Sequence, residues 1–322
     1  MQVRRMILLA TLVVLAAACG SGAEGRSGAG STTAPAVTTG PAATGPTTTT
    51  ARTFEFGTVE DVHDGDRTYR YQAALLVIPA LDASGQRASN DFDRFFCGGS
   101  LVDARHVLTA AHCVDQEQFG GVLPASYLRV AVGRTVLRSG AGTLRAVRTI
   151  SVHPRYRRGN DLGYDVAVLT LTAPVTGIEP VALVGPDDDL TFAGQRVTLT
   201  GWGDAESRKP GQVERSRLRN RLKAAHTSIV STVTCPWKVL ENPVGRDPSV
   251  ELVVCLRTGE RVGFCRGDSG GPVVAWVGDR PVQVGVINAA RGCSDPSLPG
   301  VVANLASPPI APSSTRRCAE RP

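Results

Sequence analysis

A serine surrounded by glycines near the carboxyl-terminal end of the chain has the residue types that nucleophilic chemistry requires. The segment is Gly267-Asp268-Ser269-Gly270-Gly271-Pro272. A serine hydroxyl is a weak nucleophile, so it needs a base within hydrogen-bond reach and amide donors for the oxyanion that it creates. Glycines beside Ser269 allow the backbone to turn sharply and to approach a substrate closely. Ser269 is therefore a candidate nucleophile, although a glycine-flanked serine is also typical of an ordinary turn.

The order of residues along the chain excludes one catalytic architecture. The letters G-x-S-x-G also suit the nucleophile elbow of an α/β-hydrolase, in which the histidine follows the serine. All histidines of this chain precede Ser269, and they are His63, His106, His112, His153 and His226. An α/β-hydrolase site is therefore excluded, and a histidine base for Ser269 has to come from the amino-terminal side.

Two segments supply candidates for that base and its partner. Thr109-Ala110-Ala111-His112-Cys113 places His112 between small residues and beside a cysteine that could fix its loop. Asp165 stands before the apolar run Val166-Ala167-Val168-Leu169, where a carboxylate is costly unless it has a partner. A buried carboxylate fixes the tautomer of a catalytic imidazole and stabilises the imidazolium. Taken singly, His112 is also consistent with a structural histidine, and Asp165 with a cap.

Short apolar runs rich in β-branched residues make up most of the chain beyond residue 53. Turn residues such as Gly and Asn separate these runs, and long helical stretches are few. This spacing of short strands predicts an all-β sandwich or barrel. Strands are expected at Ala73 to Ile78, Tyr127 to Val132, Asp165 to Leu171 and Arg196 to Thr200.

The amino terminus has the pattern of an export signal. Arg4-Arg5 is followed by an apolar stretch from Met6 to Ala18, which is too short to span a bilayer. The segment Ala16-Ala17-Ala18-Cys19-Gly20-Ser21 resembles a bacterial lipoprotein signal in which Cys19 carries the lipid. The alternatives are cleavage after an Ala-x-Ala site and a structural Cys19. We predict a signal peptide over residues 1–18, and either a cell-surface lipoprotein, which contacts the membrane through Cys19, or a secreted protein.

A segment of low complexity follows the signal. Residues 19–53 consist mainly of Gly, Ser, Thr, Ala and Pro, so they bury too little apolar surface to offset the entropy of ordering. A coil of about thirty such residues spans roughly 30 Å. We predict a flexible tether over residues 19–53 and one folded domain over residues 54–322.

Charge and cysteine content limit the partners and the compartment. The 35 Lys and Arg exceed the 29 Asp and Glu by six, and two of the arginines lie in the leader, so nucleic acid is not an expected partner. The basic run Arg215 to Lys223 lacks interleaved aromatic residues and is interpreted as a solvated loop face. Eight cysteines in an exported protein predict disulfide bonds.

Together, the segments around His112, Asp165 and Ser269 resemble the chymotrypsin-like, or trypsin-like, serine protease family, and they occur in that family's order. The resemblance runs from about Tyr69 to Leu305. It implies an all-β fold of two packed six-stranded antiparallel β-barrels, with the active site in the cleft between them. Further similar segments are Cys97-Gly98-Gly99-Ser100-Leu101, Val152-His153-Pro154, Thr200-Gly201-Trp202-Gly203 and Pro299-Gly300-Val301.

The resemblance also implies the chemistry. Ser269 attacks the peptide carbonyl, His112 acts as the base, Asp165 orients it, and the amides of Gly267 and Ser269 hold the oxyanion. The implied activity is that of a serine endopeptidase acting on protein or peptide substrates. It needs no cofactor and no metal, and neither an H-E-x-x-H nor a C-x-x-C ligand pattern occurs. The family's disulfides carry over as Cys97 with Cys113, Cys235 with Cys255, and Cys265 with Cys293.

The expected specificity pocket departs from that of trypsin. Trypsin has a carboxylate on the pocket floor, six residues before the nucleophile, where this chain has Gly263. Cleavage after Lys or Arg is therefore not predicted. By the same resemblance, Ala290 and Gly300 fall on the pocket walls and Phe264 lies beside the floor. We expect an uncharged pocket that accepts a small or medium apolar side chain, narrowed if Phe264 points inward.

Two further departures from the family concern the expected partners of Asp165 and Asp268. Asn288, in the strand that borders the pocket, replaces a serine that hydrogen-bonds the catalytic aspartate in the family, and its amide can also donate to Asp165. Family zymogens are cut before an Ile-Val-Gly-Gly-like start, whose new amine pairs with the aspartate preceding the nucleophile. Asp268 is present, but Thr58-Val59-Glu60-Asp61 offers no such start, so Asp268 needs another partner. The alternative function is a catalytically inactive binding module of the same fold, tethered at the cell surface.

Overall fold

Strands dominate the part of the chain that the structure describes. The computed structural model describes residues 54–78, 88–158, 162–185, 187–204, 218–231, 252–259, 262–289 and 299–307. The predicted signal peptide at residues 1–18 and the predicted tether at residues 19–53 lie outside these ranges. Within them, no helix is both long enough and apolar enough to cross a membrane.

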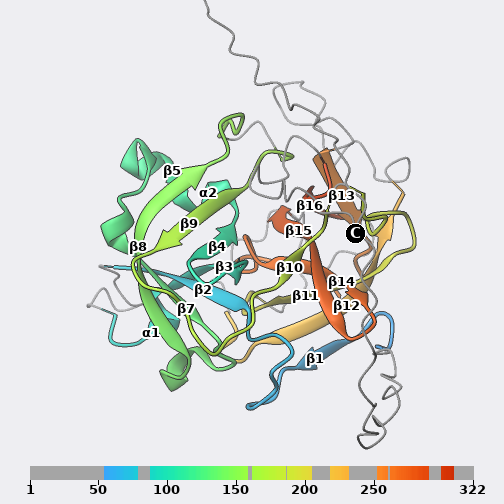
Figure 1. Ribbon diagram of the computed structural model, residues 1–322, viewed down its shortest axis with the longest axis horizontal. Coiled ribbons are helices and arrows are strands. Elements are labelled where there is room, and N and C mark those ends of the chain that lie inside the picture. Colours follow the sequence, from blue (N-terminus) through green and yellow to red (C-terminus); the bar gives the residue numbers. More distant parts are fainter. Residues whose placement is uncertain are drawn as a thin grey trace, which may run out of the picture. The chain divides into compact units, whose positions relative to one another are not determined.

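Six antiparallel strands from the amino-terminal half of the domain close into a first barrel (Figure 1). Every second residue of the fourth strand in the ring, β9, is fully buried, because one face of a barrel strand points into the core. Around the ring the strands are β2 (Gln72–Val77), β3 (Phe95–Leu101), β4 (His106–Thr109), β9 (Ala167–Leu171), β8 (Thr143–Val152) and β7 (Leu128–Val132).

Six later strands form the second barrel, which is closed by the pairing of β12 with β13. Two more strands join its outside: β1 (Val59–Asp61) pairs antiparallel with β12, and β10 (Ala182–Leu183) pairs parallel with β15. Around the ring the strands are β12 (Lys223–Val230), β11 (Arg196–Gly201), β14 (Pro272–Val277), β15 (Arg280–Ala289), β16 (Gly300–Asn304) and β13 (Val253–Leu256).

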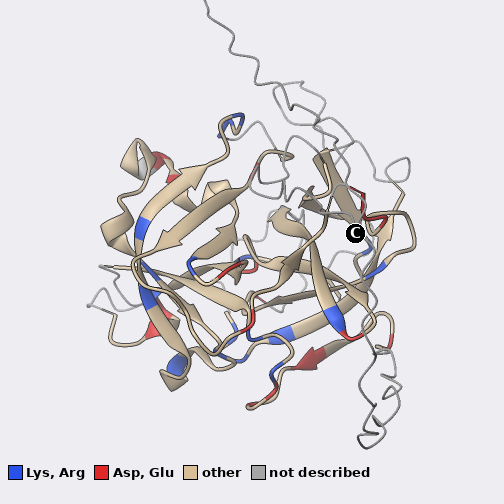
Figure 2. Ribbon diagram, in the orientation of Figure 1, with Lys and Arg blue, Asp and Glu red and all other residues tan. Residues whose placement is uncertain are grey.

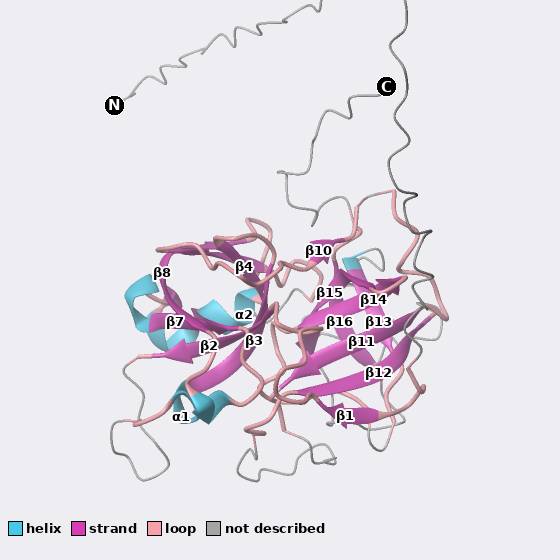
Figure 3. Cartoon of the chain, turned by 60° about the horizontal axis from the view of Figure 1, so that its bottom comes forward, coloured by secondary structure: helices cyan, strands magenta, loops and turns pink. Residues whose placement is uncertain are grey.

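Short helices lie in the connections of the first barrel, and one further 3-10 residue, Leu252, directly precedes β13 in the second barrel (Figure 3). A small two-stranded sheet accompanies them. The helical elements are α1 (Asp91–Arg94), α2 (Ala111–Val114), η1 (Glu117–Phe119), η2 (Ala125–Tyr127) and η3 (Leu137–Ser139), and the sheet is β5 (Asp115–Gln116) with β6 (Gly121–Val122).

Buried hydrogen bonds join the two barrels. Thr200 Oγ1 of β11 donates to Gln72 Oε1 of β2 at 2.6 Å, and Ser100 Oγ of β3 donates to Gln283 Oε1 of β15 at 2.6 Å. Each bond links one strand of each barrel, and all four residues are buried. The two hydroxyl groups and the two Oε1 atoms are therefore paired across the barrel contact, whereas Gln72 Nε2 is buried without a hydrogen-bond partner among the residues that the structure describes.

The predicted fold class is confirmed: the chain forms two six-stranded antiparallel β-barrels. The four strands expected from apolar runs correspond to β2, β7, β9 and β11, each shifted by no more than two residues at its ends. The largest shift is at Asp165, which precedes β9 instead of opening it. That residue is instead engaged in side-chain hydrogen bonds.

Candidate active site

His112 lies in α2, immediately after strand β4 of the first barrel. The two preceding alanines have no exposed surface, so small side chains are needed where the chain leaves the strand. The backbone amide of His112 donates to Asp165 Oδ1 at 2.7 Å, and its ring Nδ1 lies 2.6 Å from Asp165 Oδ2. The two contacts fix both the helix and the imidazole against Asp165.

Asp165 is 2% exposed, and each of its carboxylate oxygens takes one hydrogen bond from His112. These bonds offset the cost of burying the charge. An ionised carboxylate only accepts hydrogen bonds, so the proton of the neutral imidazole resides on Nδ1. Nε2 is therefore left with the lone pair that a general base requires.

Opposing effects act on the pKa of His112. Burial lowers this pKa, whereas the negative charge of Asp165 and its hydrogen bond raise it, and the net pKa lies above the ordinary value. The side chain keeps 35% of its surface exposed. Asp165 therefore makes His112 a stronger base than a free histidine.

Ser269 belongs to a tight turn of the second barrel that packs on the first. The backbone has a positive φ at Gly267 (95°) and Gly270 (80°), which favours glycine at both places. A Cβ atom at Gly270 would lie 2.2 Å from Thr109 Oγ1, so the turn also approaches β4 too closely for a side chain. The amide of Gly98 in β3 donates to the Ser269 carbonyl oxygen at 2.8 Å.

Ser269 and His112 border the same sulfur atom. Cys113 Sγ lies 3.9 Å from His112 Nε2 and 3.7 Å from the carbonyl oxygen of Ser269. No hydrogen bond joins the hydroxyl of Ser269 to Nε2 in the structure. Such bonds are often long before substrate is bound.

The backbone amides of Gly267 and Ser269 have no acceptor among the described residues. The neighbouring amides of Asp268, Gly270 and Gly271 are all bonded, to the carbonyl oxygens of Cys265, Ile287 and Asp268 respectively. These two amides are those for which the resemblance implies oxyanion binding, and that role stays a prediction.

Asp268, inside the same turn, is held by backbone amides. Its Oδ1 accepts from the amide of Gly203 at 2.8 Å, and its Oδ2 accepts from the amide of Cys265 at 3.0 Å. Burial raises the pKa of Asp268 to about 6, and the charge of Asp204 adds to this effect, although the two hydrogen bonds oppose it. Within the described part of the chain, no Lys, Arg or His forms an ion pair with this carboxylate.

The glycines of the segment Thr200-Gly201-Trp202-Gly203 make room for Asp268. A Cβ atom at Gly201 would lie 2.0 Å from Asp268 Oδ1, and one at Gly203 would lie 2.2 Å from Oδ2. Both distances are far below a van der Waals contact. The resemblance identified these glycines without giving their purpose, which is to let the carboxylate reach the end of β11.

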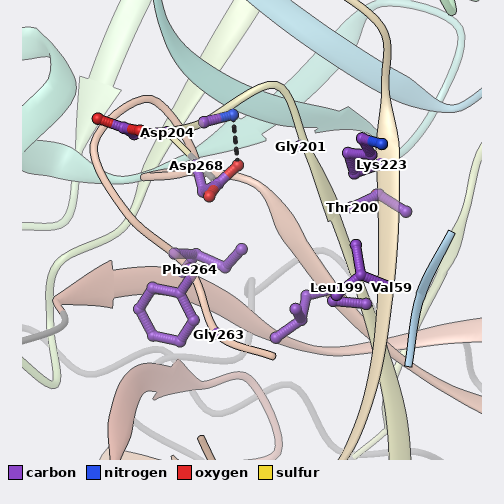
Figure 4. A pocket seen from close by; sticks show the side chains of 12 residues that line it. Val59, Leu199, Thr200, Gly201, Asp204, Lys223, Gly263, Phe264 and Asp268 are labelled. Carbon is purple, nitrogen blue, oxygen red and sulfur yellow. Dashed lines mark hydrogen bonds between the residues drawn. The ribbon is translucent and has the colours of Figure 1, made fainter. Parts of the chain in front are cut away.

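A cavity of about 60 Å³ adjoins Asp268 (Figure 4). Side chains on β1, β11 and β12, among them Val59, Leu199 and Lys223, line one side of it, and Phe264 lines another. The interpretation of Arg215 to Lys223 as a solvated loop face is wrong for Lys223. Lys223 is the first residue of β12, and its ammonium pairs with Asp61 Oδ1 at 2.6 Å. Strand pairing, which the local composition does not reveal, places it there.

Phe264 packs against Gly300, one of the predicted pocket residues. A Cβ atom at Gly300 would lie 2.3 Å from Cε1 of the ring, and Phe264 is only 3% exposed. Gly263 is partly exposed and brings no charge. Ala290, the remaining predicted wall residue, lies outside the described residues.

Asn288 does not make the hydrogen bond that we expected. It is buried near the end of β15, and its side-chain amide donates to the carbonyl oxygen of Leu162. Asp165 instead has His112 as its donor at both oxygens. The amide nitrogen of Asn288 therefore helps to hold the loop before β9.

The first predicted disulfide is present between Cys97 and Cys113, and it ties β3 to α2. Cys255 and Cys265 are also disulfide-bonded. Their predicted partners, Cys235 and Cys293, lie outside the described residues, as does Cys19.

Other sequence features have structural roles. Cys97, His112 and Cys113 cluster within 4.8 Å, but both sulfurs belong to the disulfide and so are not thiolate ligands for a metal. His106 pairs with Asp103 on the surface. His226 is buried in β12, where it contacts Thr198 and stacks on Phe54 at 4.2 Å between ring centroids.

Comparison with known proteins identifies similar sequences over most of the folded domain. The family model described as trypsin matches residues 79–308. The chain is 35% identical over 211 residues to "Trypsin" of Saccharopolyspora erythraea, an alignment that covers 65% of this chain and 82% of that protein. It is 33% identical to "Serine protease 28" of Mus musculus over 220 residues, with 66% of this chain and 74% of the relative covered. It is also 33% identical to "Tryptase" of Mus musculus over 224 residues, with 67% and 76% covered.

Proposed function

Because this chain belongs to the trypsin family and is a serine-type endopeptidase, we propose that it cuts peptide bonds through Ser269, with His112 as general base and Asp165 as the carboxylate that orients it. The observation that carries this assignment is the contact of 2.6 Å between His112 Nδ1 and the buried Asp165 Oδ2. It leaves Nε2 unprotonated beside the turn that carries Ser269.

In the proposed reaction, Ser269 Oγ bonds to the scissile carbonyl carbon while its proton passes to His112 Nε2. The amides of Gly267 and Ser269 donate to the oxyanion. They can do so because neither has another acceptor among the described residues. Nε2 then gives the proton to the leaving amine as the C–N bond breaks. Water repeats the sequence, which releases the acyl group and regenerates Ser269.

For specificity, we propose an uncharged pocket that selects a small or medium apolar side chain. Gly263 brings no carboxylate to the expected floor, and the ring of Phe264 occupies the space beside Gly300. An apolar pocket separates side chains that differ by one methylene by only about 1–3 kcal/mol, so several apolar residues would be accepted.

A fluorophosphonate probe tests the nucleophile. The purified protein is labelled beside a Ser269→Ala variant, and we expect labelling of the first alone. A His112→Ala variant should be labelled at least about 10³-fold more slowly, because the hydroxyl then has no base. If folded wild-type protein is not labelled, the assignment of Ser269 is wrong and the binding-module alternative gains support.

The same preparation, incubated with a peptide library, tests the pocket. We expect cleavage after small or medium apolar residues, and the Ser269→Ala variant controls for contaminating proteases. Cleavage confined to sites after Lys or Arg would refute the proposed pocket.

We further propose that the protein is exported and carries a lipid on Cys19. The support is the signal-like sequence over residues 1–18 and the disulfide between Cys97 and Cys113, which is typical of an oxidising compartment. Mass spectrometry of the mature amino terminus should find diacylated Cys19, and a Cys19→Ala variant should lose membrane attachment. An unmodified Cys19, or a mature start elsewhere, would contradict the proposal.

A further inference from the structure

No cationic side chain pairs with Asp268 among the described residues, and the proposed reaction does not use its charge. Two backbone amides donate hydrogen bonds to its oxygens. These hydrogen bonds alone do not fully offset the cost of removing a charged carboxylate from water. Asp268 lies between Gly267 and Ser269, the residues whose amides are proposed to hold the oxyanion. Whatever neutralises Asp268 therefore also fixes the turn that carries those amides.

In family zymogens, cleavage of the chain frees an amino group that pairs with the aspartate before the nucleophile. The corresponding segment of this chain is part of a β-strand. Val59–Asp61 forms β1, which pairs with β12 along its whole length. Asp61 of β1 lies directly opposite Lys223, the first residue of β12, whereas Glu60 lies opposite Ala224. Figure 2 shows the acidic residues of β1 in red. The counterion therefore has to come from elsewhere if β1 stays in place.

Strand register aligns Lys223 with the position of Asp268. Lys223 of β12 is directly opposite Asp61 on one side and Gly201 of β11 on the other. Directly opposite residues of antiparallel strands point to the same face of a sheet. The side chain of Lys223 therefore points to the face of the sheet to which a side chain at Gly201 would point. The carboxylate of Asp268 occupies that space beside Gly201. Figure 4 shows Gly201 between Asp268 and Lys223.

The distance suits a lysine side chain. Opposite Cβ atoms are about 5 Å apart, and the Cβ position at Gly201 is 2.0 Å from Asp268 Oδ1, so Lys223 Cβ lies within about 7 Å of that oxygen. An extended lysine spans about 5 Å from Cβ to Nζ, and a hydrogen bond adds about 2.8 Å. The cavity of about 60 Å³ that both residues line provides the space.

The present partner of Lys223 holds it weakly. The side chain of Asp61 is 47% exposed and that of Lys223 is 28% exposed. Ion pairs at such positions contribute little, because water competes for both charges. In the cavity, the ammonium would meet the carboxylate of Asp268, which is partly buried, with the buried carboxylate of Asp204 nearby.

We propose that Lys223 is a positioning residue for Ser269: its ammonium turns from Asp61 into the cavity, pairs with the carboxylate of Asp268, and so fixes the Gly267–Ser269 turn without a new amino terminus. This inference rests on the proposed function of Ser269. It makes the enzyme active as an uncut chain.

Labelling kinetics of the full-length protein test the effect on the site. The fluorophosphonate rate is compared for wild type, Lys223→Met, Lys223→Arg and Asp61→Asn, with the amino terminus of each labelled protein determined by mass spectrometry. We expect a rate at least tenfold lower for Lys223→Met, most of the wild-type rate for Lys223→Arg, and an equal or higher rate for Asp61→Asn, which releases the lysine. A wild-type rate in Lys223→Met, or labelling confined to chains cut near residue 58, would overturn the proposal.

A double-mutant cycle tests the ion pair without relying on activity. Unfolding equilibria are measured for Lys223→Met, Asp268→Asn and the double variant. We expect a coupling of at least tenfold in the unfolding constant, which equals about 1.4 kcal/mol. No coupling would refute the pair even if labelling is lost. Coupling in a wild-type protein that no probe labels would support the pair and refute the proposed function instead.

Discussion

At the scale of single residues, the site depends on how one carboxylate acts on one imidazole. Asp165 raises the pKa of His112 against the effect of burial. Protonated His112 therefore stabilises the folded state relative to the unfolded chain. This contribution is complete below the ordinary histidine pKa of about 6.5 and is lost as the pH rises through the folded value.

The reaction rate should rise with pH, whereas the stabilisation by protonated His112 falls. The reason is that only neutral His112 accepts the proton of Ser269. We expect the labelling rate to rise with pH through a midpoint above about 6.5. Asp165→Asn removes the two effects that raise the pKa and leaves burial, so the midpoint should move down. The maximal rate should fall by about 10⁴-fold, the loss known for this substitution in the Ser-His-Asp template.

The surface pair of His106 and Asp103 is a matched control for that experiment. Its Nδ1 and Oδ2 atoms are 2.7 Å apart, nearly the same distance as in the buried pair. Asp103→Asn should leave both the midpoint and the maximal rate of labelling unchanged. An equal shift in both variants would mean that His112 is not the group that titrates.

At the scale of elements, the end of each strand matters more than its middle. β4 is followed after one residue by α2, which carries His112, and Asp165 lies two residues before the start of β9. β11 ends at Gly201, where the lack of a side chain admits Asp268. The disulfide from β3 to α2 holds the imidazole's helix on the barrel wall. The proposed catalytic groups are thus attached to strands through very short connections, which limits their freedom of movement.

For the whole molecule, the proposed site depends on the relative position of the two barrels. His112 and Asp165 belong to the first barrel, and Ser269 belongs to the second. Ser100→Ala removes the donor to Gln283 in the barrel contact and leaves a buried acceptor unpaired. We expect this variant to lose about 1–3 kcal/mol in the free energy of unfolding.

Denaturant unfolding measures this loss, with Ser151→Ala on the exposed part of β8 as the control. The control should change stability by less than about 0.5 kcal/mol. Equal stabilities for the two variants would show that the buried hydrogen bond between the barrels contributes nothing net.

The all-β class and the candidates His112, Asp165 and Ser269 could be predicted from the residues alone. Local signals suffice for these, because short apolar runs rich in β-branched residues indicate strands and each candidate residue sits in a short segment with its own small or apolar neighbours. The resemblance then supplied the double barrel and the disulfide that the structure contains.

Contacts between distant segments required the three-dimensional structure. Asn288 bonds to Leu162 and not to Asp165, Phe264 packs on Gly300, and Lys223 lies opposite Gly201 in the sheet. None of these contacts has a local signal, because each joins segments far apart in sequence through strand register and barrel closure. A one-residue change of register would turn Lys223 to the opposite face of its sheet.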